Sequence, residues 1–303
     1  MSLARRIFDI DDLTPEEFAE VLEFSALRNP PKVLSNKSVA AVFEKPSLRT
    51  RNSTEVAIRQ LGGGVTTMVD QEIGIGVRES ASDIAATLSG YHDLICARVK
   101  SHQTLENFAL VSVPRGVGVV NLLSDQSHPV QALADVLTIK QLWSGGDHPK
   151  LTYVGDSNNV ASSLAKAASY AGIEVTISSP EGYEFDDPFL AELNVGEGVV
   201  KKVSDPKVAV KGANFIYTDV WVSMGQEDQT ETRLKAFSSY QVNSELMGLA
   251  GDGVKFMHCL PAHRELEVSA DVIDSKDSIV WIQAENRLHS MRGLLLKLFW
   301  KAN

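Results

Sequence analysis

The residues from Phe43 to Arg51 combine cations, hydroxyl groups and a helix start, a combination suited to binding phosphate. Ser47 and Thr50 supply hydroxyls, and Arg49 supplies a planar fork of N–H donors that matches phosphate oxygens. The free backbone N–H groups of a helix start add further donors and partial positive charge. Arg49 and Arg51 would face different sides of a helix, so we predict Arg49 as the ligand and Arg51 as its support. The alternative is an ordinary helix cap with solvated arginines, and this stretch alone favours neither.

A buried strand and an amphipathic helix are expected to flank this stretch. Ser38 to Phe43 is a short apolar run typical of a buried strand. Ala57, Ile58 and Leu61 recur at helical spacing until the glycines at 62–64 end the pattern. The predicted anion site therefore lies where a strand ends and a helix begins.

Strands alternate with helices throughout the chain. The expected strands are 38–43, 64–70, 93–98, 117–123, 151–154, 174–178, 214–218 and 254–257. The expected helices include one capped by Thr14 and Pro15, then 82–88, 104–110, 129–143, 160–171 and 284–301. The polar stretch 220–233 is expected to be a mobile loop. This order predicts an α/β fold with two doubly wound parallel sheets, in which ligands bind beyond the carboxyl ends of the strands.

The loop 144–149 is the best candidate for a linker between domains. We therefore predict one domain at 1–143, with the last helix, 285–303, packing back on it, and a second domain at 150–284. A length of 303 residues is sufficient for two domains with separate cores. The helices 129–143 and 284–301 are apolar over enough of their surface to join both domains.

Composition limits the classes of partner and compartment. The formal net charge of -10 argues against nucleic acid or an anionic membrane surface as a partner. No apolar run approaches the roughly 18 residues of a membrane span. Cys96 and Cys259 are the only cysteines, which supports no disulfide framework and predicts a cytoplasmic protein.

The other candidate residues also fall at predicted strand ends and are of two kinds. The first half of the chain supplies hydrogen-bond donors, namely Ser47, Arg49, Thr50, Arg98, His128 and Gln131. The second half supplies groups suited to an amine-bearing substrate, namely Asn159, Asp219, Ser223 and Cys259. An enzyme that moves a group from a phosphate donor to an amine needs both kinds of residue, one to bind the phosphate donor and the other to bind the amine.

Five motifs carry a family resemblance along nearly the whole chain. They are Phe43-Glu44-Lys45-Pro46-Ser47-Leu48-Arg49-Thr50-Arg51, His128-Pro129-Val130-Gln131, Asp219-Val220-Trp221-Val222-Ser223-Met224-Gly225, His258-Cys259-Leu260-Pro261 and Glu285-Asn286-Arg287. On these residues the chain resembles the carbamoyltransferases, and most closely their ornithine branch. The resemblance implies a carbamoyl phosphate domain, an ornithine domain, two helices joining them, and a homotrimer with active sites at subunit interfaces.

The resemblance also implies the reaction and a role for each residue. The carbamoyl group of carbamoyl phosphate would pass to the side-chain amine of L-ornithine, giving L-citrulline and phosphate for arginine biosynthesis, without cofactor or metal. Carbamoyl phosphate would be bound by Ser47, Leu48, Arg49, Thr50, Arg98, His128, Gln131, Cys259, Leu260 and Arg287. Ornithine would be bound by Leu123, Asn159, Asp219, Ser223 and Met224, with Cys259 and the Leu260 carbonyl facing its side-chain amine. The implied catalytic residues are Arg98, His128, Cys259 and Arg287.

Two residues depart from the family pattern. Leu48 stands where the ornithine enzymes usually have threonine, and leucine is also found in the acetylornithine branch. N-acetylornithine, N-succinylornithine or putrescine therefore remain alternative acceptors. Gly74 stands where the family usually has a polar side chain that reaches the neighbouring subunit's phosphate. Arg78 is our candidate for replacing that contact.

Other functional classes fit less well. The loop after strand 151–154 has Gly155 but lacks the later glycines of a dinucleotide-binding fingerprint, which argues against a nicotinamide cofactor. His258, Cys259 and His263 lack metal-ligand spacing. An aspartate acceptor would need a cation for its second carboxylate. A binding protein that has lost catalysis is a further alternative because of Gly74, although the principal donors are intact. Three of these residues also have a simpler interpretation. It is a helix cap for His128, an inert thiol for Cys259 and the partner of a structural arginine for Asp219.

Overall fold

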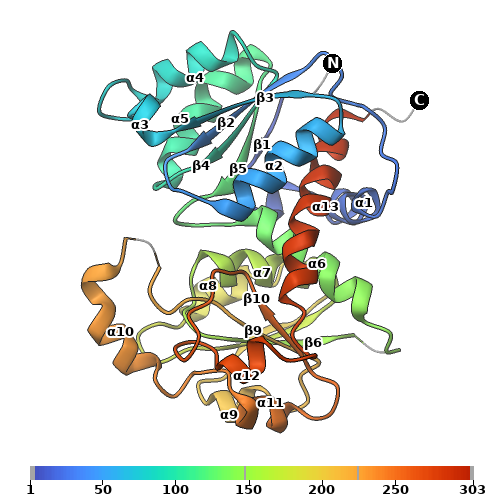
Figure 1. Cartoon of the computed structure of the whole chain (residues 1–303), viewed down its shortest axis with the longest axis vertical. Helices are drawn as coiled ribbons and strands as arrows, with labels where there is room; N and C mark the ends of the chain where they lie inside the picture. The colour runs from blue at the N-terminus through green and yellow to red at the C-terminus, as the bar shows by residue number, and fades with distance from the viewer. Residues whose placement is uncertain (1–3, 147, 224, 301–303) are drawn as a thin grey trace. The chain divides into compact units, whose positions relative to one another are not determined.

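The computed structural model describes residues 4–146, 148–223 and 225–300, which form two compact units (Figure 1). The first unit contains the described residues up to Leu137 together with those from Asn286 onward, and the second runs from Thr138 to Glu285. Each unit is built on one parallel sheet flanked by helices, so the expected α/β class is confirmed.

The first sheet has five strands in the order β1-β5-β4-β2-β3, and every neighbouring pair is parallel. Its strands are β1 (Arg6–Ile7), β2 (Ser38–Phe43), β3 (Gly64–Val69), β4 (Leu94–Arg98) and β5 (Gly118–Leu123). All except β1 were expected from apolar runs. β1 has only two residues, too few for such a pattern.

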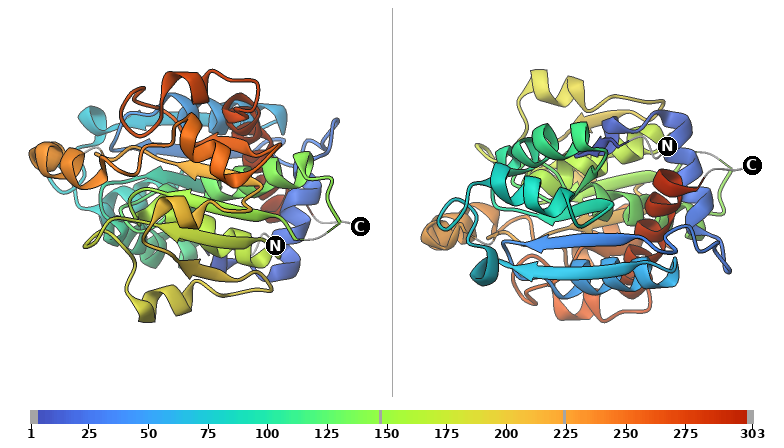
Figure 2. Two further views of the ribbon diagram at one scale, coloured as in Figure 1. Left: turned by 90° about the horizontal axis from the view of Figure 1, so that it is seen from below. Right: turned by 90° about the horizontal axis from the view of Figure 1, so that it is seen from above.

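Helices cover both faces of the first sheet. They are α1 (Pro15–Ser25), α2 (Leu48–Gln60), α3 (Asp70–Ile73), α4 (Ala81–Ser89) and α5 (His102–Ser112). α4 and α5 lie on one face and α2 runs along the other (Figures 1 and 2). Ile95 of β4 and Phe108 of α5 are buried in the core between the sheet and the helices α4 and α5. The boundary between the units falls within α6 (Pro129–Leu142) and α13 (Val280–Phe299), which continue from one unit into the other.

The second sheet has the order β10-β9-β6-β7-β8 and is also parallel throughout. Its strands are β6 (Lys150–Val154), β7 (Glu174–Ser178), β8 (Val200–Lys202), β9 (Phe215–Thr218) and β10 (Lys255–His258). Its helices are α7 (Asn159–Tyr170), α8 (Asp187–Glu192), α9 (Pro206–Ala209), α10 (Thr230–Phe237), α11 (Ser244–Ala250) and α12 (Ala270–Ile273).

The expectation of a loop throughout 220–233 was wrong in its last part. A short 3-10 helix at Glu227–Gln229 leads directly into α10. Trp221 is buried, and its ring stacks on that of Phe237 with centroids 5.9 Å apart. The polar composition of the stretch concealed these anchors, because Trp221 and Arg233 are buried at positions with no apolar periodicity around them.

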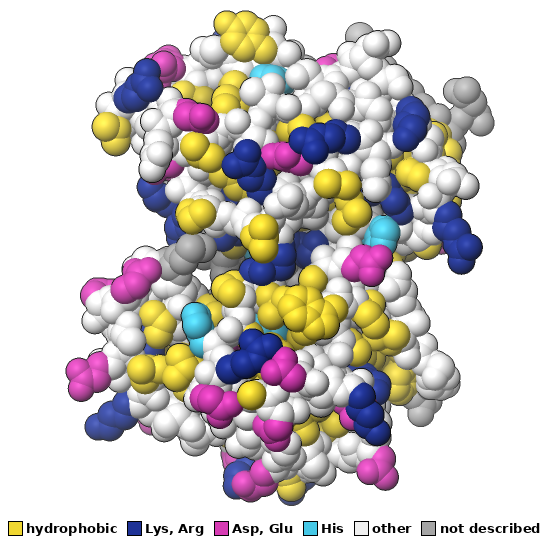
Figure 3. Space-filling model, in the orientation of Figure 1, with side chains coloured by type: hydrophobic (Ala, Val, Ile, Leu, Met, Phe, Trp, Pro, Cys, Tyr) yellow, Lys and Arg dark blue, Asp and Glu magenta, His cyan; other side chains and the backbone are white. Residues whose placement is uncertain are grey.

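Charges are spread over the surface of both units. Acidic and basic side chains are interspersed on the face drawn in Figure 3. Within the described ranges, no helix is long and apolar enough to cross a membrane.

Gly293 allows α13 to pack closely on α1 within the first unit. A Cβ atom at this position would lie inside van der Waals contact with Ser25 Oγ and the Val21 carbonyl oxygen. We expect Gly293→Ala to lower the free energy of unfolding by about 1–3 kcal/mol, because neither backbone nor buried Ser25 can move away cheaply. Urea denaturation measures this. Gly248→Ala, at a glycine of α11 with no neighbour within 4 Å of the added Cβ, is the control, and equal midpoints for the two variants would contradict the prediction.

Candidate active site

The amino terminus of α2 is the helix start that we predicted to bind an anion. Ser47 is the N-cap, and its hydroxyl accepts a hydrogen bond from the Thr50 N–H at 3.2 Å. Leu48 opens the helix with 74% of its surface exposed, so it contributes its backbone and little packing. Arg51 forms an ion pair with Glu55 at 2.9 Å, and its role as support for Arg49 stays a prediction.

Arg287 joins α13 to α2 and α6 inside the first unit. Its Nη1 donates to Gln131 Oε1, and its Nη2 donates to Thr50 Oγ1 at 3.0 Å. Gln131 Nε2 in turn donates to Asp135 Oδ1 at 2.8 Å. Arg287 is only 3% exposed, and Thr50 and Gln131 are equally buried. Three residues that are distant in sequence therefore form one preorganised hydrogen-bonded group.

His128 lies immediately before α6 and is buried. Burial first, and then the positive charges of Arg287, Arg98 and Arg49, hold its pKa well below the ordinary histidine value. The imidazole is therefore neutral at physiological pH and can serve as a hydrogen-bonding group. Arg98, the buried last residue of β4, belongs to the same cluster of cations. Such a cluster around a neutral imidazole favours an anionic ligand.

Backbone hydrogen bonds tie together the strand ends that carry these residues. The Glu44 N–H donates to the Arg98 carbonyl, and the Val99 N–H donates to the Leu123 carbonyl, each at 2.9 Å. The Lys100 N–H donates to the Glu44 carboxylate at 2.8 Å. The ends of β2, β4 and β5 are thus held in a fixed arrangement, and Leu123 contributes its carbonyl to it.

Asp219 organises a second group of residues, within the second unit. Its Oδ1 accepts from the Val220 N–H and from Cys259 Sγ, each at 2.8 Å, and its Oδ2 accepts from Asn158 Nδ2 at 3.1 Å. Asp219 is buried and Cys259 is half-buried. A buried carboxylate beside a thiol and an amide is suited to binding an ammonium group.

The segment after β10 has a fixed backbone. The Leu260 N–H donates to His258 Nδ1 at 2.8 Å, and His258 Nε2 lies 3.2 Å from Glu267 Oε1. Leu260 has a φ of 58°, a left-handed conformation that is costly for leucine and must be held by its surroundings. His258 and Glu267 are fully buried, so they supply that support and set the direction of the Leu260 carbonyl.

The other residues predicted to bind the amine substrate differ in what the structure shows of them. Asn159 is the half-buried first residue of α7. The side chain of its neighbour Asn158, which sequence reasoning missed, donates a hydrogen bond to Asp219. Asn158 also caps α7 by accepting from Val160 and Ala161, and an asparagine before a helix was the signal available. Ser223 donates its backbone N–H to Gln226 Oε1 at 3.1 Å, and Met224 lies outside the described residues.

Asp219, His258 and Cys259 could together offer ligand atoms to a metal ion, since those atoms lie within 4.8 Å of one another. This differs from the set His258, Cys259 and His263 considered from sequence. Both ring nitrogens of His258 already form hydrogen bonds, and the Cys259 thiol donates to Asp219. A metal ion would have to displace these contacts, so the group is better suited to its present hydrogen bonding.

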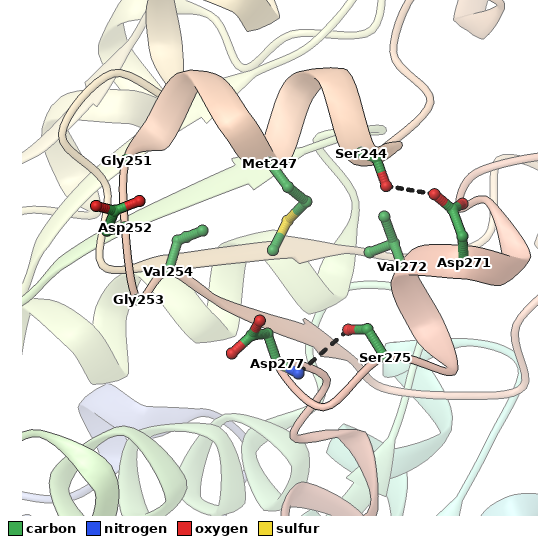
Figure 4. Close-up of a pocket in the computed structure, with 10 residues that line it drawn as sticks. All are labelled: Ser244, Met247, Gly251, Asp252, Gly253, Val254, Asp271, Val272, Ser275 and Asp277. Carbon is green, nitrogen blue, oxygen red and sulfur yellow. Dashed lines mark hydrogen bonds between the residues drawn. The ribbon is translucent and has the colours of Figure 1, made fainter.

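A pocket of about 260 Å³ lies elsewhere in the second unit (Figure 4). It is lined by residues of α11, α12, the turn before β10 and the segment after α12, including Asp252, Asp271 and Asp277. Asp271 accepts from Ser244, and Asp277 is paired with Lys255 at 2.6 Å. The pocket is at the amino end of β10, whereas ligands of parallel sheets bind at carboxyl ends. None of the predicted site residues lines it, and we assign it no role.

Two family models together match most of the chain. The model described as "Aspartate/ornithine carbamoyltransferase, carbamoyl-P binding domain" matches residues 5–141. The model described as "Aspartate/ornithine carbamoyltransferase, Asp/Orn binding domain" matches residues 147–298. Thr50, His128 and Gln131 fall within the first match, whereas Asp219 and Cys259 fall within the second, which also contains Arg287.

Individual relatives agree with the family models. "Ornithine carbamoyltransferase" of Methanosarcina mazei is 43% identical over 98% of this chain and 99% of its own. "Ornithine carbamoyltransferase, anabolic" of Pyrococcus furiosus is 45% identical over 97% and 96%. Among solved structures, ornithine carbamoyltransferase from Pyrococcus furiosus superposes with a TM-score of 0.92, at 42% identity over 100% of both chains. That from Thermus thermophilus has a TM-score of 0.87, at 40% identity over 97% and 98%.

Proposed function

The chain belongs to the aspartate/ornithine carbamoyltransferase family and acts as an ornithine carbamoyltransferase, and from that premise we propose how its residues share the reaction. The enzyme transfers the carbamoyl group of carbamoyl phosphate to the side-chain amine of L-ornithine and releases phosphate. The observation that carries this assignment is similarity over the full chain to enzymes named for this activity.

The residues of the first unit bind carbamoyl phosphate in this proposal. The phosphate is held by Ser47, Arg49, Thr50, the Leu48 N–H and Arg98. These groups stabilise the negative charge that grows on the phosphate as it leaves. His128, Gln131 and Arg287 bind the carbamoyl group. What supports this is the burial of Arg287 against Gln131 and Thr50 and the cation cluster around His128. Donors that are fixed before reaction stabilise a developing oxyanion without reorganisation.

The residues of the second unit bind ornithine in this proposal. The amino acid end of ornithine is held by Asp219, Asn159, Ser223 and Met224. Leu123 of the first unit contributes its backbone to ornithine binding. Cys259 and the Leu260 carbonyl face the side-chain amine, as well as bordering the carbamoyl group. The hydrogen bonds of Asp219 to Cys259 and Asn158 support this division. Catalysis requires the two bound substrates to meet, so much of the acceleration comes from holding them together.

The assignment is tested by measuring carbamoylated product from carbamoyl phosphate with ornithine, N-acetylornithine, N-succinylornithine, putrescine and aspartate in parallel. We expect citrulline from ornithine at a kcat/KM at least about 100-fold above that for any other acceptor, since a buried polar site rejects a substrate that leaves its groups unpaired. Faster turnover of an acylated ornithine or of putrescine would contradict the ornithine assignment.

The rate at subsaturating ornithine is expected to rise by up to about 100-fold from pH 7 to pH 9. The nucleophile is a neutral amine, and by analogy with lysine its pKa is about 10.4, so each pH unit raises its free fraction by up to about tenfold. The pKa of His128 is depressed, so this imidazole is already neutral at pH 7 and adds no titration in the window. Initial rates with saturating carbamoyl phosphate measure the profile. A flat profile under conditions where chemistry limits the rate would rule out this account.

Arg78 is proposed to replace the polar contact that Gly74 cannot make. Arg78 is exposed, and its Nη1 donates to the Glu72 carbonyl at 2.9 Å, which braces the turn containing Gly74. We expect Arg78→Ala to weaken carbamoyl phosphate binding about fivefold, the loss of one exposed charge-assisted contact. Equilibrium dialysis measures this, with Arg59→Ala of the same unit, an exposed arginine of α2 paired with Glu55, as the control. An unchanged affinity in Arg78→Ala would remove Arg78 from the site.

Assembly, compartment and pathway are proposed as well. The family resemblance supports a homotrimer with active sites at subunit interfaces, which light scattering would test as a mass about three times the 33.0 kDa of one chain. The two free cysteines, with Cys96 buried and its pKa raised to about 12, support a cytoplasmic location. The name of the Pyrococcus furiosus relative, which includes "anabolic", supports the synthetic direction and hence arginine biosynthesis.

A further inference from the structure

A buried ion pair connects three segments at the carboxyl end of the second sheet. Arg233 of α10 donates from Nη1 to Asp156 Oδ2 at 2.8 Å and to the Trp221 carbonyl at 3.0 Å. Its guanidinium carbon also lies 4.9 Å from the centre of the Tyr183 ring. The side chains of Arg233 and Asp156 are 7% and 9% exposed. One arginine thus joins α10 to the loop after β6, the segment after β9 and the segment after β7.

The segment held by Arg233 is the one that carries the proposed ornithine-binding residues. It leaves β9 at Asp219, passes through Trp221 and Ser223, and returns to α10. The Ser223 N–H donates to Gln226 Oε1, and Arg233 Nε donates to Gln229 Oε1 at 3.2 Å. The segment is therefore folded against α10 and depends on Arg233 at both of its ends.

Asp156, the other member of the ion pair, belongs to the loop that supports Asp219. The Asp156 carbonyl accepts from the Asn158 N–H at 2.8 Å, and Asn158 Nδ2 donates to Asp219 Oδ2. Burial raises the pKa of Asp156, and the charge and hydrogen bond of Arg233 oppose that rise. Without Arg233 the carboxyl group would lose the contact that favours its charged form. Without Asp156, Arg233 would be a buried charge lacking its counterion, which is strongly unfavourable.

We propose that Asp156 and Arg233 are the positioning pair of the ornithine subsite, holding Trp221 and Gln229, which lie on either side of the proposed binding residue Ser223, against the Asn158 loop. This inference rests on the proposed function. Both residues belong to the second unit, whereas the residues proposed to hold the phosphate belong to the first. Their loss is therefore expected to act on ornithine selectively, whereas a general weakening of the fold would reduce the amount of active enzyme without altering ornithine affinity.

The test compares Asp156→Asn, Arg233→Gln and the conservative Arg233→Lys with wild-type enzyme. In the two neutral variants the KM for ornithine is expected to rise about tenfold or more, because displacement of binding groups by about 1 Å has costs of this order. The dissociation constant of carbamoyl phosphate, measured by equilibrium dialysis without ornithine, is expected to stay within twofold. Arg233→Lys should give an intermediate KM, since one ammonium cannot reproduce the arginine's bonds to Asp156, Trp221 and Gln229 together.

The exposed pair Lys207–Glu245 of the same unit, 2.7 Å apart, provides matched controls. Lys207→Gln and Glu245→Gln make the same charge changes, and both should retain wild-type KM values. An ornithine KM within twofold of wild type in folded Asp156→Asn and Arg233→Gln would overturn the proposal. If either neutral variant fails to fold, the test is the ornithine KM of Arg233→Lys, and a value within twofold of wild type would overturn the proposal. If all three variants fail to fold, the pair is a folding element only. Absence of citrulline formation by wild-type enzyme would instead refute the proposed function.

Discussion

Replacing Arg287 with methionine is expected to lower kcat/KM for carbamoyl phosphate by about 10²–10³-fold, the range found when one preorganised oxyanion donor is removed. Methionine fills much of the volume but removes the bonds to Gln131 and Thr50 and one cation beside His128. The effect should appear in kcat as well as KM, because the lost donors act most strongly as charge develops. Steady-state rates at saturating ornithine measure it.

Arg292→Met separates this effect from a loss of stability. Arg292 is a second buried arginine of α13, and it bonds to Gln60 and to the carbonyls of Ser25 and Leu27. Its loss should lower the melting temperature while kcat/KM stays within about threefold of wild type. Arg287→Lys should restore little activity, since an ammonium cannot donate in the geometry of a planar fork. A kcat/KM in Arg287→Met similar to that of Arg292→Met would show that Arg287 acts only in the fold.

Local sequence signals were sufficient for the framework of the candidate site. The run Ser38–Phe43 is β2 to the residue, and Ser47 caps α2 as the strand–turn–helix pattern indicates. At α1, Thr14 and Glu17 form the expected capping box. These features depend on residues within a few positions of one another, which is why periodicity and cap chemistry could predict them.

Contacts between distant residues could not be predicted from such signals. Periodicity places Arg287 on a helix, but does not show that it bonds to Thr50 and Gln131 on two other helices. Similarly, the hydrogen bond from Asn158 to Asp219 was missed, because the role of Asn158 as the cap of α7 depends on where that helix begins, an uncertain boundary in any sequence. Arg233 was expected only as part of a polar loop, because its burial comes from Tyr183 and Asp156, which are remote in the chain.

Replacing Asp219 with asparagine is the second substitution with a large expected effect. Asparagine keeps the shape, but removes the charge that would hold the ammonium group at the amino acid end of ornithine. It also removes one of the two carboxylate oxygens that accept from Cys259, Val220 and Asn158. Removing one partner of a buried charged contact costs about 2–5 kcal/mol, so kcat/KM for ornithine should fall by about 10²-fold or more. Carbamoyl phosphate affinity should stay within twofold, because Asp219 is assigned to the other substrate. Initial rates over a range of ornithine concentrations, with equilibrium dialysis of carbamoyl phosphate, measure both quantities.

Asp277→Asn is the matched control for Asp219→Asn, since Asp277 belongs to the same unit and pairs with Lys255 at the amino end of β10. It should leave both substrates unaffected, whereas Asp219→Asn should affect ornithine alone. If Asp219→Asn instead weakened carbamoyl phosphate and left the ornithine KM intact, the proposed division of substrates between the two domains would be reversed. Equal modest losses for both substrates would mean that Asp219 mainly stabilises its surroundings through Asn158 and Cys259. Selectivity for one substrate, more than the size of the loss, therefore decides whether this carboxylate binds the amino acid.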